Sequence, residues 1–532
     1  NKINVFPVPD GDTGTNMAFT MNAILDGTEN HVHTRVDDML EAVADSALDG
    51  ARGNSGAILA QFFQGLSDGS VGLETMNAKQ LAIAFGKGSE YARDALSEPK
   101  EGTIITVMRD VSTALSSKNI EEENMLNIFN DIHRVAKKSL ENTPELMPLL
   151  KDSGVVDAGA EGYVNLIEGM LYYIENEEIM NQSVIANMKV EESSPLNNSN
   201  EDYENSEFQF CTECIIENDD MRRRDIKEKL SEMGDSFILA GNKSKVKIHI
   251  HTNNPSKVFS ICESFGTLKN QKADDMHTQI QSSHQSTFKI AIVTDSACDI
   301  ANDSHNTNIH VVPVRYSFGD KDYIDKISQT SEEFYDELMT NPIHPKTSQP
   351  PAGDFISKYE YLSTHFDSII SIHLPEKLSG TLDSCKNAIK RMGNLKITTI
   401  DSLSASTGLG LIINSASELS KTIHNHEELV NKIQSLVENT KIYLGVKNID
   451  YAIKGGRVPK FKGVIAKALN IKPILTTDSE GKLKAESALF GIKNFHNRLA
   501  AFVISKIDHD AHYKFSIAHS NAEDEGHEIV EF

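Results

Sequence analysis

Two aspartates near the start of the chain are the residues best suited to chemistry. Asp10 and Asp12 flank Gly11, which allows the backbone to turn sharply. Carboxylates this close repel each other unless a cation lies between them, and Mg²⁺ is the usual cation where phosphate is also bound. The polar run from Thr13 to Asn16 leads into a predicted helix, whose N-terminal amides suit phosphate oxygens. The alternative is a capped turn with two solvated aspartates.

A second set of residues has the chemistry of a metal site. His249 and His251 alternate along a predicted strand, so their side chains project to one face. Cys211 and Cys214 lie on an earlier predicted strand, where their spacing places them on opposite faces. Because Cys and His are the usual zinc ligands, this set predicts a zinc site. The spacing does not decide whether Cys214 is one of its ligands. The alternative is two core cysteines and a structural histidine pair.

The C-terminal half contains several hydroxyl-rich loops next to predicted strands and helices. These loops include residues 346–350, 378–382 and 401–408. Arg457 adds a fixed positive charge near two glycines, and His519 follows a predicted strand. Hydroxyls and N-terminal helix amides bind anions, so together these loops suit a carboxylate. Taken singly, each is equally consistent with an ordinary helix cap.

The charge of the chain restricts its partners. The sequence has 52 Lys and Arg against 77 Asp and Glu, a net charge of −25, which argues against nucleic-acid binding and docking on anionic lipid. Residues 1–180 alone hold 13 Lys and Arg against 29 Asp and Glu, a net of −16, so bound cations are expected there. Five scattered cysteines indicate a cytoplasmic protein, and no apolar run is long enough for a transmembrane segment. We also expect residues before Asn1 and after Phe532.

Hydrophobic periodicity divides the chain into three domains. Residues 1–180 have the three- and four-residue spacing of helices and predict an all-α domain. Residues 206–269 predict a small α/β domain, and residues 288–532 a larger α/β domain with a parallel sheet and room for two lobes. Polar linkers are expected at 181–205 and 270–287. The expected helices are 17–25, 36–48, 57–66, 78–96, 103–115, 125–140, 160–173 and 223–233; the expected strands are 208–217, 236–240, 246–251, 289–294, 368–373, 396–400, 441–446 and 515–518.

Four motifs in the first domain resemble the DhaL-type (DAK2) kinase domain, in the version found in the bacterial fatty acid kinase catalytic subunit. They are residues 4–17, 50–56, 101–106 and 153–159. The resemblance implies a helical barrel that binds ATP, with Mg²⁺ held by Asp10, Asp12 and Asn4. The residues that it places at the nucleotide are Thr13, Thr15, Asn16, Asn54, Ser55, Thr103 and Asp157. For Asp157 a plain helix N-cap remains the alternative.

The other two domains also resemble known families. The Cys211-Thr-Glu strand and the His249-Ile-His251 segment are similar to the middle domain of the same kinase subunit, which implies Cys211, His249 and His251 as zinc ligands. That family more often has an aromatic residue at Cys214. Residues 288–532 resemble the DegV family, which binds single fatty acids. This second resemblance implies that Arg457 faces the phosphoryl group, that Asp295 and Ser296 shape the floor of the site, and that the fatty acid carboxylate is held by Thr347, Ser348, Ser379, Thr381 and His519.

Together these resemblances imply a fatty acid kinase in one multidomain chain. ATP, Mg²⁺ and Zn²⁺ are the expected cofactors, and Asp10, Asp12 and Arg457 the expected catalytic residues. The product is an acyl-phosphate for phospholipid synthesis. Expected partners are a fatty acid, a second copy of the chain bound through the kinase region, and an acyltransferase that uses acyl-phosphate. Two alternatives remain: a dihydroxyacetone-type kinase, and a non-catalytic lipid carrier or regulator with a nucleotide-sensing domain.

Overall fold

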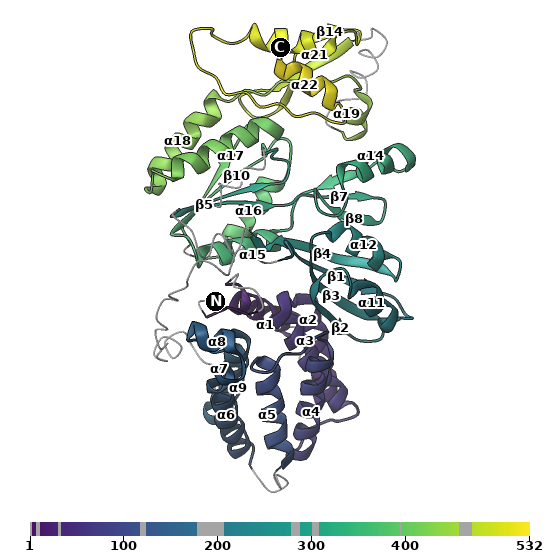
Figure 1. Ribbon diagram of the computed structural model, residues 1–532, viewed down its shortest axis with the longest axis vertical. Helices are drawn as coiled ribbons and strands as arrows, with labels where there is room; N and C mark the ends of the chain where they lie inside the picture. Colours follow the sequence, from purple (N-terminus) through teal and green to yellow (C-terminus); the bar gives the residue numbers. More distant parts are fainter. Residues whose placement is uncertain are drawn as a thin grey trace. The chain divides into compact units, whose positions relative to one another are not determined.

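The computed structural model has two compact units, Asn1–Ser283 (unit 1) and His284–Phe532 (unit 2), whose elements are drawn in Figure 1 and labelled where there is room. Among the residues that it describes, no helix combines the length and apolar character needed to cross a membrane. Two of the three predicted catalytic residues, Asp10 and Arg457, lie outside the described residues. The structure describes residues 3–6, 11–29, 33–117, 124–177, 207–277, 288–300, 308–393, 395–456 and 471–531.

The first part of unit 1 is helical, as the periodicity predicted. Its core centres on α3, where Phe62 makes edge-to-face contacts with Phe85 and Tyr163 at centroid distances of 5.5 and 5.3 Å. Helices α3 and α4 cross closely at two glycines, since a Cβ on Gly65 would lie 2.5 Å from the Cα of Gly88. The helices are α1 (Thr13–Thr28), α2 (Val36–Gly50), α3 (Gly53–Ser70), α4 (Ala78–Asp94), α5 (Ile104–Ser117), α6 (Met125–Glu141), α7 (Thr143–Leu146), α8 (Pro148–Ser153) and α9 (Ala158–Asn176).

The second part of unit 1 is an antiparallel sheet with the strand order β2-β3-β1-β4. The predicted domain end at residue 269 is wrong, because β4 continues into the expected linker and pairs along β1. This strand is polar and lies at an edge of the sheet, so it lacks the apolar alternation that marks half-buried strands. The elements are β1 (Phe210–Glu217), α11 (Arg223–Leu230), β2 (Asp235–Gly241), β3 (Lys245–Thr252), α12 (Pro255–Glu263) and β4 (Thr267–Asp275).

The helical part and the sheet share one hydrophobic core, although the sequence predicted two separate domains. Ile238 and Ala240 of β2 belong to the same buried cluster as the helices. Leu96 forms a bridge with Ile238, and the Leu239 N–H donates to the carbonyl of Ala95 at 3.2 Å. Unit 1 therefore holds the sheet against the helices through both apolar packing and backbone hydrogen bonds.

Unit 2 is built around a parallel sheet, as predicted, and its strand order is β11-β10-β5-β6. Alternate residues of β5 enter two different clusters: Ile290 and Ile292 pack with α17 and α18, whereas Ala291 and Val293 pack with α15 and α16. Helices therefore cover both faces of this sheet. The elements are β5 (Ile290–Asp295), β6 (Ile309–Val312), α15 (Ala352–Ser363), β10 (Ser368–His373), α16 (Thr381–Ile389), β11 (Ile397–Asp401), α17 (Ser406–Ser420) and α18 (His426–Asn439).

Two small antiparallel sheets complete unit 2, ordered β8-β7-β9 and β12-β13-β14. The strand predicted at 441–446 is reduced to two residues, and the strand predicted at 515–518 is wrong. Phe515 and Ile517 are exposed, and their segment has no ladder partner in the described part of the chain. The elements are β7 (Arg315–Phe318), β8 (Lys321–Ile324), α14 (Ser331–Thr340), β9 (Lys346–Ser348), β12 (Leu444–Gly445), α19 (Asp450–Lys454), β13 (Ile471–Thr477), β14 (Leu483–Phe490), α21 (Phe495–Ile504) and α22 (Glu523–Glu531).

The buried hydroxyl of Tyr163 gives a test of the unit 1 core. Its oxygen has no hydrogen-bond partner among the described residues. Tyr163→Phe should therefore raise the free energy of unfolding of unit 1 by about 1 kcal/mol, because it removes an unsatisfied buried polar group. The matched control is Tyr91→Phe, which deletes a hydroxyl that donates to Asp68 at 2.8 Å and should lower stability by about 1 kcal/mol. Urea denaturation followed by circular dichroism measures both, and a destabilised Tyr163→Phe would contradict the assignment.

Candidate functional site

The loop that carries Asp12, called the acidic loop below, enters α1 through a sharp turn at Gly11. Gly11 has a φ of 69°, a conformation that favours glycine, as the sequence predicted. Asp12 is the N-cap residue of α1, and its carbonyl accepts from the Asn16 N–H at 2.9 Å. The side chain of Asp12 makes no capping hydrogen bond, which argues against the capped-turn interpretation.

A small hollow in unit 1 joins the first two predicted sites. Its volume is about 30 Å³, room for an ion or a water rather than for a whole nucleotide. It brings the acidic loop and the turn before α3 against the three predicted zinc ligands of the sheet. Thr15 is absent from the lining. The lining residues are Asn4, Asp12, Thr13, Asn16, Gly53, Asn54, Ser55, Cys211, His249 and His251.

The turn at the start of α3 depends on glycine. Gly53 has a φ of 58°, and a Cβ there would lie 2.4 Å from the Asn16 side-chain nitrogen. The Gly53 N–H donates to Glu213 Oε1 at 2.6 Å, so a residue of the sheet fixes this turn. Asn54 Oδ1 is buried with no hydrogen-bond partner among the described residues. The turn therefore presents an unused acceptor beside the hollow.

Two other predicted nucleotide residues, Ser55 and Asp157, lie close together near this turn. A Cβ on Gly159 would lie 3.4 Å from both Ser55 Oγ and Asp157 Oδ1, so these two side chains are neighbours. Asp157 is the N-cap of α9 and accepts from the Ala160 N–H at 2.8 Å. Burial raises the pKa of Asp157 to about 6. Thr103 Oγ1 donates to the carbonyl of Lys100, so its hydroxyl already has an acceptor.

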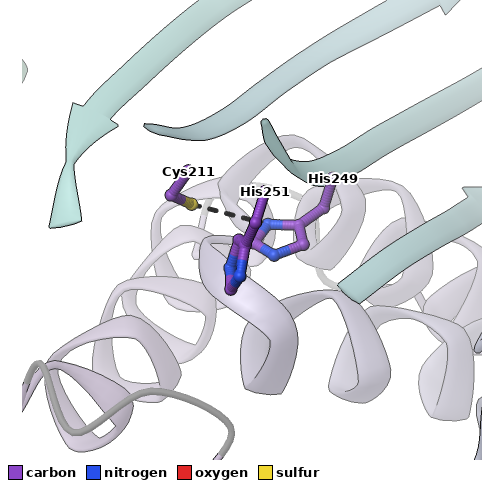
Figure 2. A group of neighbouring side chains, drawn as sticks. All are labelled: Cys211, His249 and His251. Atoms are coloured by element: carbon purple, nitrogen blue, oxygen red, sulfur yellow. Dashed lines mark hydrogen bonds between the residues drawn. The ribbon is translucent and has the colours of Figure 1, made fainter. Parts of the chain in front are cut away.

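Cys211, His249 and His251 form the candidate metal group shown in Figure 2, with their ligand atoms within 4.8 Å of one another. Cys211 lies opposite His251 in the β1–β3 ladder. The histidines are buried, and burial lowers the pKa of His249, which favours the neutral imidazole that binds metals. One thiol and two imidazoles suit zinc with an open position. The donor set therefore fits the ion that the sequence predicted.

Cys214 takes no part in this group. It lies on the opposite face of β1, where it is buried and interacts with the thiol of Cys262. This interaction and burial raise the pKa of the Cys214 thiol well above its ordinary value. Cys214 is therefore not a member of the candidate metal group, because its side chain projects from the face of β1 opposite to that of Cys211.

In unit 2 the two loops predicted to hold a carboxylate lie together. Ser384 Oγ donates to the carbonyl of Pro350 at 2.6 Å, and Gln349 packs against Gly380 so closely that a Cβ there would overlap it. Ser379 Oγ lies 2.8 Å from Thr381 Oγ1. Thr347 and Ser348 lie in β9, beside this contact.

His519 is not brought to these loops by any hydrogen bond or ion pair in the described part of unit 2. Its side chain is exposed, and its Nδ1 accepts from the Ala522 N–H at 3.4 Å. Asp295 does lie at the carboxyl end of β5, as expected, and its surroundings were not predicted. Asp295 Oδ2 accepts from the Leu374 N–H at 3.0 Å and lies 3.1 Å from His373 Nδ1.

The Asp295–His373 pair is fully buried and continues into a hydrogen-bond chain. His373 Nε2 lies 2.7 Å from Ser371 Oγ, which lies 2.6 Å from the hydroxyl of Tyr359. Burial alone would lower the pKa of His373, but the hydrogen bonds and charges of Asp295 and Cys385 outweigh burial and raise it to about 9. A histidine within an apolar strand gave no sequence signal for this partner.

Three family comparisons match consecutive parts of the chain. Residues 7–172 match the DAK2 domain, residues 207–283 match the FakA-like middle domain of fatty acid kinase, and residues 289–532 match the DegV family, described as uncharacterised protein. The second of these ranges includes β4, in agreement with the sheet.

Relatives of known sequence or structure each cover part of the chain. An uncharacterized protein of Staphylococcus saprophyticus is 36% identical over 288 residues, which are 52% of this chain and 51% of that protein. The chain thus spans about half the length of the curated relatives that it matches. A fatty-acid-binding DegV family protein from Thermus thermophilus is 26% identical with a TM-score of 0.38, covering 41% of this chain and 77% of that one. A fatty acid binding DegV family protein from Streptococcus agalactiae is 25% identical with a TM-score of 0.42, covering 46% and 87%.

The buried pair in unit 2 predicts a pH dependence. Because the pKa of His373 is raised to about 9, its contribution to stability is complete below its ordinary value near 6.5 and is lost as the pH rises through about 9. At pH 7 Asp295→Asn should lower the free energy of unfolding of unit 2 by about 3 kcal/mol and flatten its decline above pH 6.5. Pulse proteolysis in urea, read from unit 2 peptides, measures both effects.

The matched control is the exposed His512, whose replacement by Asn should leave the stability curve unchanged. An unaltered pH dependence in Asp295→Asn would show that the Asp295–His373 pair does not carry the effect.

Proposed function

We propose that this chain, which carries a DAK2 domain, a FakA-like middle domain and a DegV domain, is a fatty acid kinase. It transfers the γ-phosphoryl group of ATP to the carboxylate of a fatty acid. The observation that carries the proposal is the hollow in unit 1, where the acidic loop, the start of α3 and the Cys/His group meet. These groups could bind phosphate together with metal cations, and positioning and neutralising the phosphates is the main requirement of phosphoryl transfer.

The start of each of two long helices supports phosphate binding at this hollow. Thr13 begins α1, Gly53 begins α3, and both line the hollow. Helix N-termini carry amides without intrahelical acceptors and a partial positive charge, so they favour phosphate oxygens. In the proposal, a metal ion occupies the hollow, the terminal phosphates of ATP lie at its opening, and the rest of the nucleotide extends past Ser55 and Asp157.

Two metals belong to the proposal. Asp10, Asp12 and Asn4 would hold Mg²⁺, which offsets the negative charge of the triphosphate in this acidic segment. Cys211, His249 and His251 would hold Zn²⁺, which adds positive charge at the same hollow. In the proposal these protein groups fix the position of the phosphates.

The acceptor in this proposal is the carboxylate held by Thr347, Ser348, Ser379 and Thr381. A fatty acid carboxylate is already a nucleophile, so the reaction needs no strong general base. One carboxylate oxygen forms a bond to the γ-phosphorus while the bond to the ADP oxygen breaks, which yields an acyl-phosphate and ADP. In the proposal Arg457 faces the phosphoryl group. His519 is not part of the proposed acceptor site, because in the described part of unit 2 no hydrogen bond or ion pair brings it to these loops.

The product and the acceptor define the partners. An acyl-phosphate is a reactive mixed anhydride, so the proposal includes an acyltransferase that consumes it. It also includes a second copy of the chain, bound through the kinase region.

Asp12→Asn tests the kinase reaction. Hydroxylamine traps acyl-phosphate as a hydroxamate, so the full chain is incubated with oleate, ATP and Mg²⁺ and the hydroxamate is measured. The variant should form product about 100-fold more slowly, because it loses a carboxylate proposed to hold the Mg²⁺ that positions the phosphates. Its oleate binding should stay unchanged. Asp26→Asn, an exposed aspartate of the same helix, is the matched control and should keep full activity. If the unaltered chain makes no hydroxamate but phosphorylates dihydroxyacetone, the acceptor class is wrong.

Cys211→Ser tests the proposed zinc site. After dialysis against trace zinc, the unaltered chain should retain about one zinc per chain by elemental analysis, and Cys211→Ser should lose most of it. Cobalt substitution should give a thiolate-to-cobalt charge-transfer band that disappears in the same variant. Cys214→Ser is the matched control because Cys214 lies on the other face of β1, and it should retain both signals. Equal loss in the two variants would argue against the assigned ligand set.

A further inference from the structure

Glu213 contacts both the candidate metal group, which is Cys211, His249 and His251, and the turn at Gly53 that begins α3. This turn is called the nucleotide turn below. It is on β1, and only 2% of it is exposed. Its Oε1 accepts from the Gly53 N–H at 2.6 Å and lies 3.0 Å from His249 Nδ1. Its Oε2 lies 3.4 Å from the Lys247 ammonium. One buried carboxylate therefore contacts a predicted metal ligand, the turn that opens α3 and a buried cation.

The distances assign the ring proton of His249. Its Nδ1 lies 3.0 Å from Glu213 Oε1 and 3.7 Å from Cys211 Sγ, so the Nδ1–H donates to the carboxylate. The lone pair is then on Nε2, which is buried and has no hydrogen-bond partner among the described residues. A carboxylate that orients a histidine in this way is the usual support of a metal ligand.

The same carboxylate fixes the nucleotide turn. The Gly53 N–H is at the first turn of α3 and has no intrahelical acceptor, so Glu213 satisfies a group that would otherwise be buried without a partner. Lys247 donates to the carbonyl of Ala51 and pairs with Glu213. Two residues of the sheet therefore hold this turn: Glu213 binds the Gly53 N–H, and Lys247 binds the carbonyl of Ala51.

His251 provides an internal comparison. Its Nδ1 lies 3.2 Å from Asp235 Oδ1, so it also has a supporting carboxylate. The Asp235 side chain is 62% exposed, and no hydrogen bond or ion pair links it to the turn in the described part of unit 1. The two histidines are therefore supported alike, but only the support of His249 reaches the nucleotide turn.

We propose that Glu213 is a positioning residue that couples the metal group to the nucleotide turn. It orients His249 toward the metal and fixes the Gly53 amide, so binding of zinc and binding of ATP strengthen each other. Such coupling is reciprocal, because each ligand must change the affinity of the other by the same factor. The inference rests on the proposed function only in requiring that the chain bind both ligands.

The experiment measures zinc affinity of the full chain by competition with a chromophoric chelator, with and without Mg²⁺ and a non-hydrolysable ATP analogue. The analogue should tighten zinc binding by about 5-fold or more in the unaltered chain. Glu213→Gln alone would leave Lys247 buried without its counter-charge, so Glu213→Gln is combined with Lys247→Met. This double variant should bind zinc about 10- to 100-fold more weakly and show no effect of the analogue. A urea midpoint near that of the unaltered chain establishes that it folds.

Asp235→Asn is the matched control. It should weaken zinc binding through His251 but keep the effect of the analogue, because it leaves the Gly53 contact intact. A double variant that keeps the zinc affinity and the analogue effect would overturn the inference, as would independent binding of the two ligands to the unaltered chain; both results leave the proposed function standing. If the unaltered chain binds neither zinc nor the analogue, the proposed function fails and the inference fails with it.

Discussion

The contact between β1 and the first turn of α3 is the interaction on which the candidate site depends. The acidic loop and the turn belong to the helices, whereas Cys211, His249 and His251 belong to the sheet. The hollow is lined by residues of both the helices and the sheet, so it forms only where these two parts of unit 1 pack together. Glu213 and Lys247 bridge the two parts with charges that are costly to leave unpaired once buried. Separation of the sheet from the turn would therefore destroy the site and leave these charges without partners.

This arrangement explains how an acidic segment can suit an anionic ligand. Residues 1–180 carry a net charge of −16, yet the groups at the hollow include the N-termini of α1 and α3 and a donor set for a cation. In the proposed function, local positive charge from the helix N-termini and bound cations, rather than the net charge, determines which ligand binds. The net charge keeps its meaning for the surface as a whole, where it disfavours nucleic acid.

The sequence predicted those features that depend on neighbouring residues of the chain. The long helices follow from apolar periodicity, and the facing histidines follow from their alternation on a strand. Strand β4 was missed because its stability comes from hydrogen bonds to β1 rather than from apolar residues of its own. The strand predicted at 515–518 is absent, because a short apolar segment does not by itself supply a partner strand. Glu213 was missed for a third reason: its role depends on Gly53, which is 160 residues away in the sequence.

Units 1 and 2 use the same local arrangement with different chemical results. In unit 1 Glu213 accepts a loop amide from Gly53 and the Nδ1–H of His249; in unit 2 Asp295 accepts a loop amide from Leu374 and pairs with Nδ1 of His373. The difference lies at the other ring nitrogen. His373 Nε2 is hydrogen-bonded to the hydroxyl of Ser371, so this nitrogen already has a partner. His249 Nε2 has no such partner among the described residues, so the same support leaves it able to bind a metal.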